Sequence, residues 1–272
     1  MPDTPAFDDT LAWQLRRGRP LDVGTPIIDI HSHVGPYFVH NPKMFGAEHL
    51  VEVMDRTGVD KSCIFSHRAV QSDWLSGNDE TAGAVARFPN RFIGFAVADA
   101  NFPDQIPSEL ERCFETLDLK HIKIHCALHQ VPWDDRRYEP VLDFANERGC
   151  CVLVHTWPQC FDTYRKYAEK YPRITFIAAH LNYWDATDGH PWPKVVRECP
   201  NVYSDLCRSW TEYNYIAQAI AAFGAENLVW GSDFPFIGQP NQLAKVAYAK
   251  IPLGDKTKLL SLNALKIISG LI

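Results

Sequence analysis

The chain has 272 residues, of which 46% are hydrophobic and 22% charged, and it carries a net charge of −6. This composition is typical of a globular protein with a sizeable core. The acidic balance offers no basic face, which excludes binding to nucleic acid or anionic membrane through charge, so we expect a small-molecule substrate. The eight cysteines form no CxxC pair, and the chain starts without the apolar run of a secretory signal. We therefore expect reduced thiols and a cytoplasmic protein.

In chain order, residues 1–25 read as an N-terminal extension with a short helix at 8–17, and residues 26–272 read as one domain. The first strand is expected at 27–35, IIDIHSHVG, followed by an amphipathic helix at 46–58. Further strand-like runs recur at about the length of a βαβ unit, at 61–67, 91–99, 119–125, 150–156, 173–180, 201–206 and 228–233. Helical patterns separate them, for example at 108–117, 138–148, 161–171 and 211–223, and a C-terminal helix is expected at 260–271. Eight strand–helix repeats close a parallel barrel, so the sequence predicts an α/β fold of the (β/α)8 TIM-barrel type, with a doubly wound open sheet as the alternative.

Metal-competent side chains end several of these runs. Side chains alternate along a strand, so His31 and His33 share one face of the first strand. His155 ends the fifth run, His180 the sixth and Asp233 the eighth. Catalytic groups of a parallel barrel lie at the C-terminal ends of its strands, so we expect all five side chains at one level.

The motifs that carry these residues resemble those of a known family. DIHSH, VLVHT, IAAH, GSDFP and the final LSLNALKIISGL follow one another in the order and at the strand ends found in the metal-dependent amidohydrolase superfamily. The chain is most similar to its amidohydrolase-related (amidohydrolase 2) branch of small barrels. The resemblance implies that His31, His33, His155 and Asp233 bind a metal ion and that Asp233 takes a proton from the nucleophilic water. It implies that His180 touches the metal or holds the water or a substrate oxygen.

The expected cofactor is one divalent ion, with zinc as first choice and manganese or iron as alternatives, because ligand type does not separate them. Such an ion lowers the pKa of bound water to about 7. Lys123, in the fourth strand, matches the lysine that many relatives carboxylate to hold a second metal. The alternative, which we favour, is a barrel lysine paired with a carboxylate.

Residues near the strand ends are candidates for substrate binding. His125 lies on the face of Lys123, nearer the rim, and Trp157 and Tyr183 belong to a set of aromatic residues that follow the strands. They predict a pocket for a ring or an apolar acyl group. Arg68 and Arg208 follow the second and seventh strands and either hold a substrate carboxylate or lie solvated at the surface. The sixth strand continues as AHLNYW where the family often has AHxG, which adds bulk at this point.

Three functions are open at this stage. The first is a metal-dependent hydrolase acting on a small amide, lactone or ester. The second is a non-oxidative decarboxylase, because the branch contains lactonases but also enzymes resembling aminocarboxymuconate-semialdehyde decarboxylase. The short connection after His33, and His31 in place of a glutamate, argue against it. The third is a barrel that has lost catalysis, but no ligand position is missing. Homo-oligomers are common in the branch and are an expectation for this chain as well.

Overall fold

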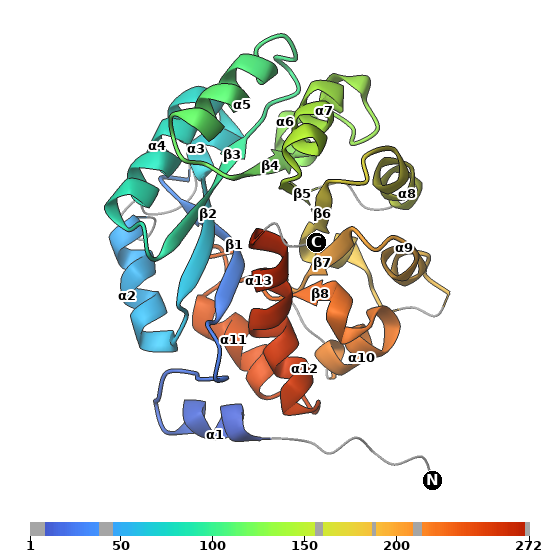
Figure 1. Cartoon of the computed structure of the whole chain (residues 1–272). Coiled ribbons are helices and arrows are strands. Elements are labelled where there is room, and N and C mark those ends of the chain that lie inside the picture. Colours follow the sequence, from blue (N-terminus) through green and yellow to red (C-terminus); the bar gives the residue numbers. More distant parts are fainter. Residues whose placement is uncertain (1–8, 38–45, 156–159, 187–188, 209–213, 270–272) are drawn as a thin grey trace.

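A computed structural model describes residues 9–37, 46–155, 160–186, 189–208 and 214–269. Eight parallel strands form one sheet in sequence order. The helices surround it on the outside (Figure 1). The strands are β1 (Ile28–Val34), β2 (Lys61–Ser66), β3 (Phe92–Val97), β4 (His121–His125), β5 (Cys151–His155), β6 (Thr175–Ala178), β7 (Val202–Asp205) and β8 (Leu228–Val229).

The sheet closes on itself between its first and last strands. The amide of Ile30 donates to the carbonyl of Trp230 at 3.2 Å, and the amide of His33 donates to that of Phe234 at 2.7 Å. The predicted (β/α)8 barrel is therefore confirmed. The last strand is shorter than the predicted run, because the residues after Val229 bond to β1 in a turn rather than extend the ladder to β7.

Helices connect consecutive strands, and further helices precede β1 and follow β8. They are α1 (Thr10–Arg16), α2 (Ala47–Thr57), α3 (His67–Gln71), α4 (Trp74–Arg87), α5 (Ile106–Glu115), α6 (Cys126–His129), α7 (Glu139–Arg148), α8 (Phe161–Lys170), α9 (Trp192–Glu198), α10 (Tyr215–Phe223), α11 (Gln239–Ala247), α12 (Leu253–Thr257) and α13 (Asn263–Ile268). Short 3-10 segments lie at Arg136–Tyr138, Ala179–Tyr183 and Ala225–Asn227, and a π-helical turn lies at Lys258–Leu262. Glycine ends α2 and α7, where Gly58 and Gly149 take the left-handed conformation that a C-cap requires.

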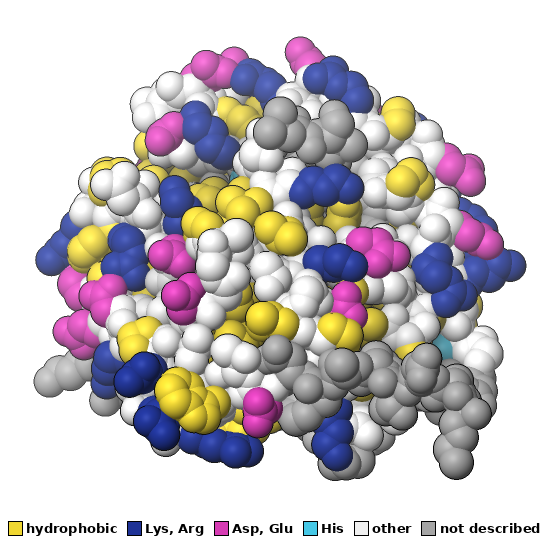
Figure 2. Space-filling view, turned by 60° about the horizontal axis from the view of Figure 1, so that its bottom comes forward, with side chains coloured by type: hydrophobic (Ala, Val, Ile, Leu, Met, Phe, Trp, Pro, Cys, Tyr) yellow, Lys and Arg dark blue, Asp and Glu magenta, His cyan; other side chains and the backbone are white. Residues whose placement is uncertain are grey.

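The expected N-terminal helix is present as α1, which packs on α11 and buries Leu11 and Ala12. The division into an extension of 25 residues and one barrel domain stays a prediction. Basic and acidic side chains are interspersed on the face that Figure 2 brings forward. None of the helices in the described ranges has the length and apolar character needed to cross a bilayer.

The interior of the barrel is apolar at its base and polar toward the C-terminal ends of the strands. All seven residues of β1 are buried, and the core continues through side chains such as Ile64, Phe95, Leu153 and Ile177. One extra residue lies in β1 between Asp29 and Ser32, where the register against β2 shifts. This bulge includes His31 and re-aims the strand at its first histidine.

Candidate metal centre

Three side chains converge where β1 meets the turn after β8. Oδ1 of Asp233 lies 3.5 Å from Nε2 of His31 and 3.2 Å from Nε2 of His33. The backbone of Asp233 has a positive φ of 58°, and its amide donates to the carbonyl of His31 at 2.8 Å. This strained turn thus brings the carboxylate back over the first strand.

The donor set fits a divalent ion. Two ligands of a tetrahedral ion with bonds of 2.0–2.1 Å are roughly 3.3 Å apart, close to the separations seen here. Burial lowers the pKa of His31 and lowers that of His33 well below the usual value, so both rings are neutral at pH 7, as ligands must be. Among the described residues, Nδ1 of His33 is buried without a hydrogen-bond partner. Two imidazoles and one carboxylate leave open positions, as catalytic zinc sites do.

Asp205, at the end of β7, sets the orientation of His31. Its carboxylate is fully buried and accepts the Nδ1 proton of His31 at 2.8 Å. In the neutral ring, this hydrogen bond leaves the lone pair of Nε2 directed at Asp233. Burial acts to raise the pKa of Asp205, but the interactions with His31 and His180 outweigh it, and the pKa is lowered.

A second group of rings lies beside the first. Nδ1 of His180 contacts the carbonyl of Cys207 at 2.5 Å, and its Nε2 lies 3.1 Å from Nδ1 of His155. Nε2 of His155 lies 2.8 Å from the hydroxyl of Tyr183. A carbonyl only accepts, so in the neutral rings His180 donates from Nδ1, His155 donates to His180, and Tyr183 donates to His155.

This chain of hydrogen bonds occupies both nitrogens of His155 and of His180. Neither ring joins the compact donor set of His31, His33 and Asp233, but His180 forms a second group of possible metal ligands with His31 and Cys207. For His155, binding an ion would therefore require one of these bonds to break, and its assignment as a ligand stays a prediction. The predicted role of His180 toward the metal, the water or a substrate oxygen also stays a prediction.

Lys123 is buried in the barrel centre. Its Nζ lies 3.5 Å from Nε2 of His31 and 4.7 Å from the centre of the Phe65 ring. Burial lowers its pKa to about 8, against the attraction of Asp205 and Asp233. Both interpretations of Lys123, a barrel lysine paired with a carboxylate and a carboxylated lysine, stay predictions.

A cavity of about 300 Å³ opens in front of the donor set. Its described lining is His33, Tyr37, His67, Val70, His125, Ala127, Leu128, His155, His180, Asp233 and Phe236. Its walls are largely imidazole and aromatic rings: His33 stacks on His67 with ring centres 4.3 Å apart, and His125 stacks on His155 at 4.0 Å.

Of the predicted substrate-binding residues, some lie at the cavity and others lie away from it. His125 lines the cavity, and Tyr183 touches its wall through His155. Arg68 is 45% exposed and lies 3.7 Å from Glu80, and Arg208 is buried against the carbonyl of Trp184; neither is in the described lining. Trp157 lies outside the described residues.

Sequence reasoning did not single out Asp205, His67 or the role of Asp29. Asp205 and His67 lie near the ends of predicted strand runs. This is the same position in the run that identified the five candidate metal ligands, so the signal was present in the sequence. Asp29 accepts hydrogen bonds from the side chains of Ser32, Ser232 and Gln239, so it ties β1 to the turn after β8 instead of facing the cavity.

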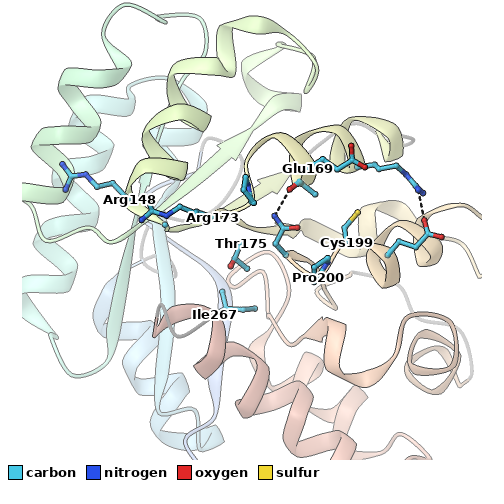
Figure 3. A pocket seen from close by; sticks show the side chains of 13 residues that line it. Arg148, Glu169, Arg173, Thr175, Cys199, Pro200 and Ile267 are labelled. Carbon is cyan, nitrogen blue, oxygen red and sulfur yellow. Dashed lines mark hydrogen bonds and ion pairs between the residues drawn. The ribbon is translucent and has the colours of Figure 1, made fainter.

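A second, larger cavity of about 740 Å³ lies at the opposite end of the barrel, where β5, β6 and β7 begin. Figure 3 shows Arg148 and Arg173 on one side of it and Cys199 and Pro200 on the other. It contains none of the predicted site residues.

Comparison with known proteins agrees with the barrel fold. Residues 28–269 match the family model described as amidohydrolase. The chain belongs to the amidohydrolase family. The predicted recognition of the amidohydrolase 2 branch is thereby confirmed.

Among curated proteins, the chain is similar to L-fucono-1,5-lactonase of Burkholderia ambifaria, with 25% identity over 214 residues, or 70% of each chain. Among solved structures, it is similar to 5-carboxyvanillate decarboxylase from Sphingomonas paucimobilis, with a TM-score of 0.71 and 17% identity over 90% of this chain and 99% of that one. A 5-carboxyvanillate decarboxylase from Novosphingobium aromaticivorans, complexed with manganese, gives a TM-score of 0.71 and 14% identity over 90% of this chain and 96% of that one. At these identities the solved structures show the fold alone. The chain is thus an amidohydrolase-family enzyme whose buried histidine and aspartate group is able to bind a divalent metal.

Proposed function

We propose that this enzyme is a metal-dependent hydrolase that opens a small lactone ring. The observation that carries the proposal is the convergence of Nε2 of His31, Nε2 of His33 and Oδ1 of Asp233 at the wall of the cavity. The similarity to a curated lactonase over 70% of both chains supports an ester carbonyl as the point of attack.

A divalent ion held by these three residues supplies Lewis acidity toward a carbonyl oxygen and lowers the pKa of water. Zinc remains our first choice, with manganese as the alternative that the solved decarboxylase structure supports. The carboxylate of Asp233 is 15% exposed and borders the cavity, so it is able to accept the proton of the attacking water.

His125 is the best placed donor to the oxygen that becomes negative during the attack. Its Nδ1 accepts the amide of Leu128 at 3.2 Å, so the neutral ring carries its proton on Nε2. Burial lowers the pKa of His125 well below the usual value, which keeps the ring neutral. A fixed N–H in a buried site stabilises a developing oxyanion.

The cavity favours a compact neutral ring as substrate. Its volume of about 300 Å³ is at the lower end for ligand pockets. Aromatic and imidazole rings form its walls, and its described lining has no arginine or lysine to pair with a substrate carboxylate. Both features support a cyclic ester over an aromatic acid.

The second candidate is decarboxylation of an aromatic acid. The similarity of the fold to 5-carboxyvanillate decarboxylases favours it, and the aromatic walls at Tyr37 and Phe236 would accept a planar ring. The lack of a cation in the described lining weighs against it.

The test uses the zinc-loaded and the manganese-loaded protein with two substrate panels. One panel holds five- and six-membered lactones of sugar acids, assayed by acid release in a weakly buffered indicator solution. The other holds hydroxylated benzoic acids, assayed by release of carbon dioxide. We expect turnover of a lactone and none of the acids, with the His33→Asn protein as the matched blank. Release of carbon dioxide without lactone hydrolysis would establish the second candidate.

A further inference from the structure

The segment that carries His180 and Tyr183 has an unusual backbone. Four consecutive residues, 180–183, have positive φ angles of 57°, 52°, 47° and 59°, and none is glycine. A left-handed turn costs roughly 1–2 kcal/mol for each such residue, so the surrounding structure must hold it in place. We call residues 180–183 the left-handed turn.

The last residue of β7 and the segment after it hold the start of the left-handed turn. The carboxylate of Asp205 accepts the amide of His180 at 2.7 Å, and the carbonyl of Cys207 accepts from Nδ1 of the same ring at 2.5 Å. These bonds fix both the backbone and the side chain of the first residue.

Arg208, the next residue, holds the other end. Its Nη1 donates to the carbonyl of Trp184, directly after the left-handed turn, and to the hydroxyl of Tyr215 at 2.7 Å. The Tyr215 hydroxyl lies 3.4 Å from the same carbonyl. Gln242 and Lys245 of α11 in turn donate to the backbone carbonyl of Arg208. Arg208 is only 5% exposed, so its guanidinium is part of the frame and not of the solvated rim.

The left-handed turn delivers two side chains to one wall of the cavity. His180 meets Nδ1 of His155 at 3.1 Å, and the Tyr183 hydroxyl meets Nε2 at 2.8 Å. His155 in turn stacks on His125, the ring assigned above as the donor to the substrate oxygen. The frame therefore connects Arg208 to the reacting end of the cavity through fixed hydrogen bonds.

We propose that Arg208 is a positioning residue: with Tyr215 it fixes the carbonyl of Trp184, and so keeps His180 and Tyr183 closed on His155. This inference rests on the proposed function, because positioning matters only if the cavity wall takes part in catalysis. It differs from the expectation that Arg208 binds a substrate carboxylate, because Arg208 is only 5% exposed and is absent from the described lining of the cavity.

The first test does not use activity. In the metal-free protein, where no ion competes for the nitrogens of His155, the nitrogen resonances of this ring report whether both of its hydrogen bonds are made. We expect Arg208→Met to shift both resonances and Tyr215→Phe, which removes only a hydroxyl, to shift them in the same direction by less. Arg165→Met, at the opposite end of the barrel, serves as the matched control and should leave them unchanged. Unaltered His155 resonances in folded Arg208→Met protein would overturn the proposal.

The second test is a double-mutant cycle on turnover. Displacement of a catalytic wall lowers kcat about 10-fold to 100-fold, with a smaller change in KM. If Arg208 acts through the left-handed turn, Arg208→Met should lower kcat much less in a Tyr183→Phe background than in the wild-type protein. Full additivity, or a rise in KM for carboxylated substrates with kcat unchanged, would contradict positioning and support carboxylate binding. If no lactone is turned over while the resonances shift as expected, the proposed function fails and the positioning of the wall stands.

Discussion

The two ends of the barrel both carry a cavity, but they differ in what their polar groups are bonded to. At the N-terminal end, the cavity of about 740 Å³ is more than twice as large as the one of about 300 Å³ at the other end. Two of the three arginines in its described lining are paired with neighbouring carboxylates: Arg165 lies 2.7 Å from Glu198, and Arg148 lies 2.7 Å from Glu111. At the C-terminal end, donor atoms of different strands point at one another across a cavity wall. Convergence of donors, and not cavity size, therefore locates the chemistry, in agreement with the rule for parallel barrels.

The largest effect is expected at the C-terminal end from Asp233→Asn. The amide is nearly isosteric but cannot accept a proton, and it is a poor metal ligand. We expect kcat to fall by about 10³-fold or more, with little change in the melting temperature. Steady-state kinetics and thermal unfolding measure the two effects. Wild-type turnover in this variant would exclude Asp233 as the base.

The second largest effect is expected from Asp205, which orients the predicted metal ligand His31. Asp205→Asn replaces the charged acceptor for Nδ1 of His31 by a neutral one, which weakens the hydrogen bond that selects the ring tautomer. We expect the affinity for zinc to fall about 10-fold to 100-fold. Competition with a chromophoric chelator measures it, and Glu198→Gln at the opposite end is the control. Equal affinities in the variant and the wild type would show that His31 does not depend on this orientation.

A pH effect on stability is expected from the N-terminal end, where His121 begins β4. Burial lowers its pKa from 6.5 to about 4, so between these values the unfolded chain binds a proton that the native protein does not. Native stability is therefore lost as the pH falls from 6.5 to 4, by about 3 kcal/mol at full extent. His121→Asn retains an acceptor for the amide of Cys151 but does not titrate. Urea unfolding at pH 7 and pH 4 should show a smaller loss in the variant; equal losses would mean that His121 is protonated in the native state.

The smallest effect is expected from Arg165→Met at the rim of the larger cavity. The ion pair with Glu198 is well exposed, with side chains 38% and 44% accessible, and such pairs contribute about 0–1 kcal/mol. We expect kcat and KM to stay within about twofold of wild type, since neither residue reaches the donor set. A large loss of kcat in this variant would break the contrast between the two ends.

The sequence predicted the barrel and the converging donors for a physical reason. The strand runs repeat at a regular interval, and parallel strands place their C-terminal residues at one edge of the barrel. The sequence positions of His31, His33 and Asp233 therefore predict that these residues lie close together. Element ends were predicted less well. Two helices, α3 and α4, follow β2, and β6 ends at Ala178, before the histidine that the predicted run included.

The sequence did not predict the conformation of residues 180–183 or the orientation of the two histidines, because both depend on tertiary contacts. Residues 180–183 read HLNY, a pattern that does not predict a left-handed turn. The turn is stabilised by Asp205 and Arg208, which are distant in sequence. His180 lies beside His31 as expected, in a group with Cys207, but the same turn also directs it to His155, which lies outside both donor groups. The orientation of a side chain at a strand end depends on its neighbours and not on its position in the run.

The central claim is that His31, His33 and Asp233 hold one divalent ion that the activity requires. The most direct measurement determines the metal content per chain by mass spectrometry, together with activity, for the protein as purified, after exhaustive chelation, and after return of zinc or manganese. The account predicts about one ion per wild-type chain, loss of turnover on chelation, recovery on return of the metal, and no stoichiometric binding in a His31→Asn, His33→Asn protein. Full activity in a metal-free preparation, or undiminished metal binding in the double variant, would contradict it.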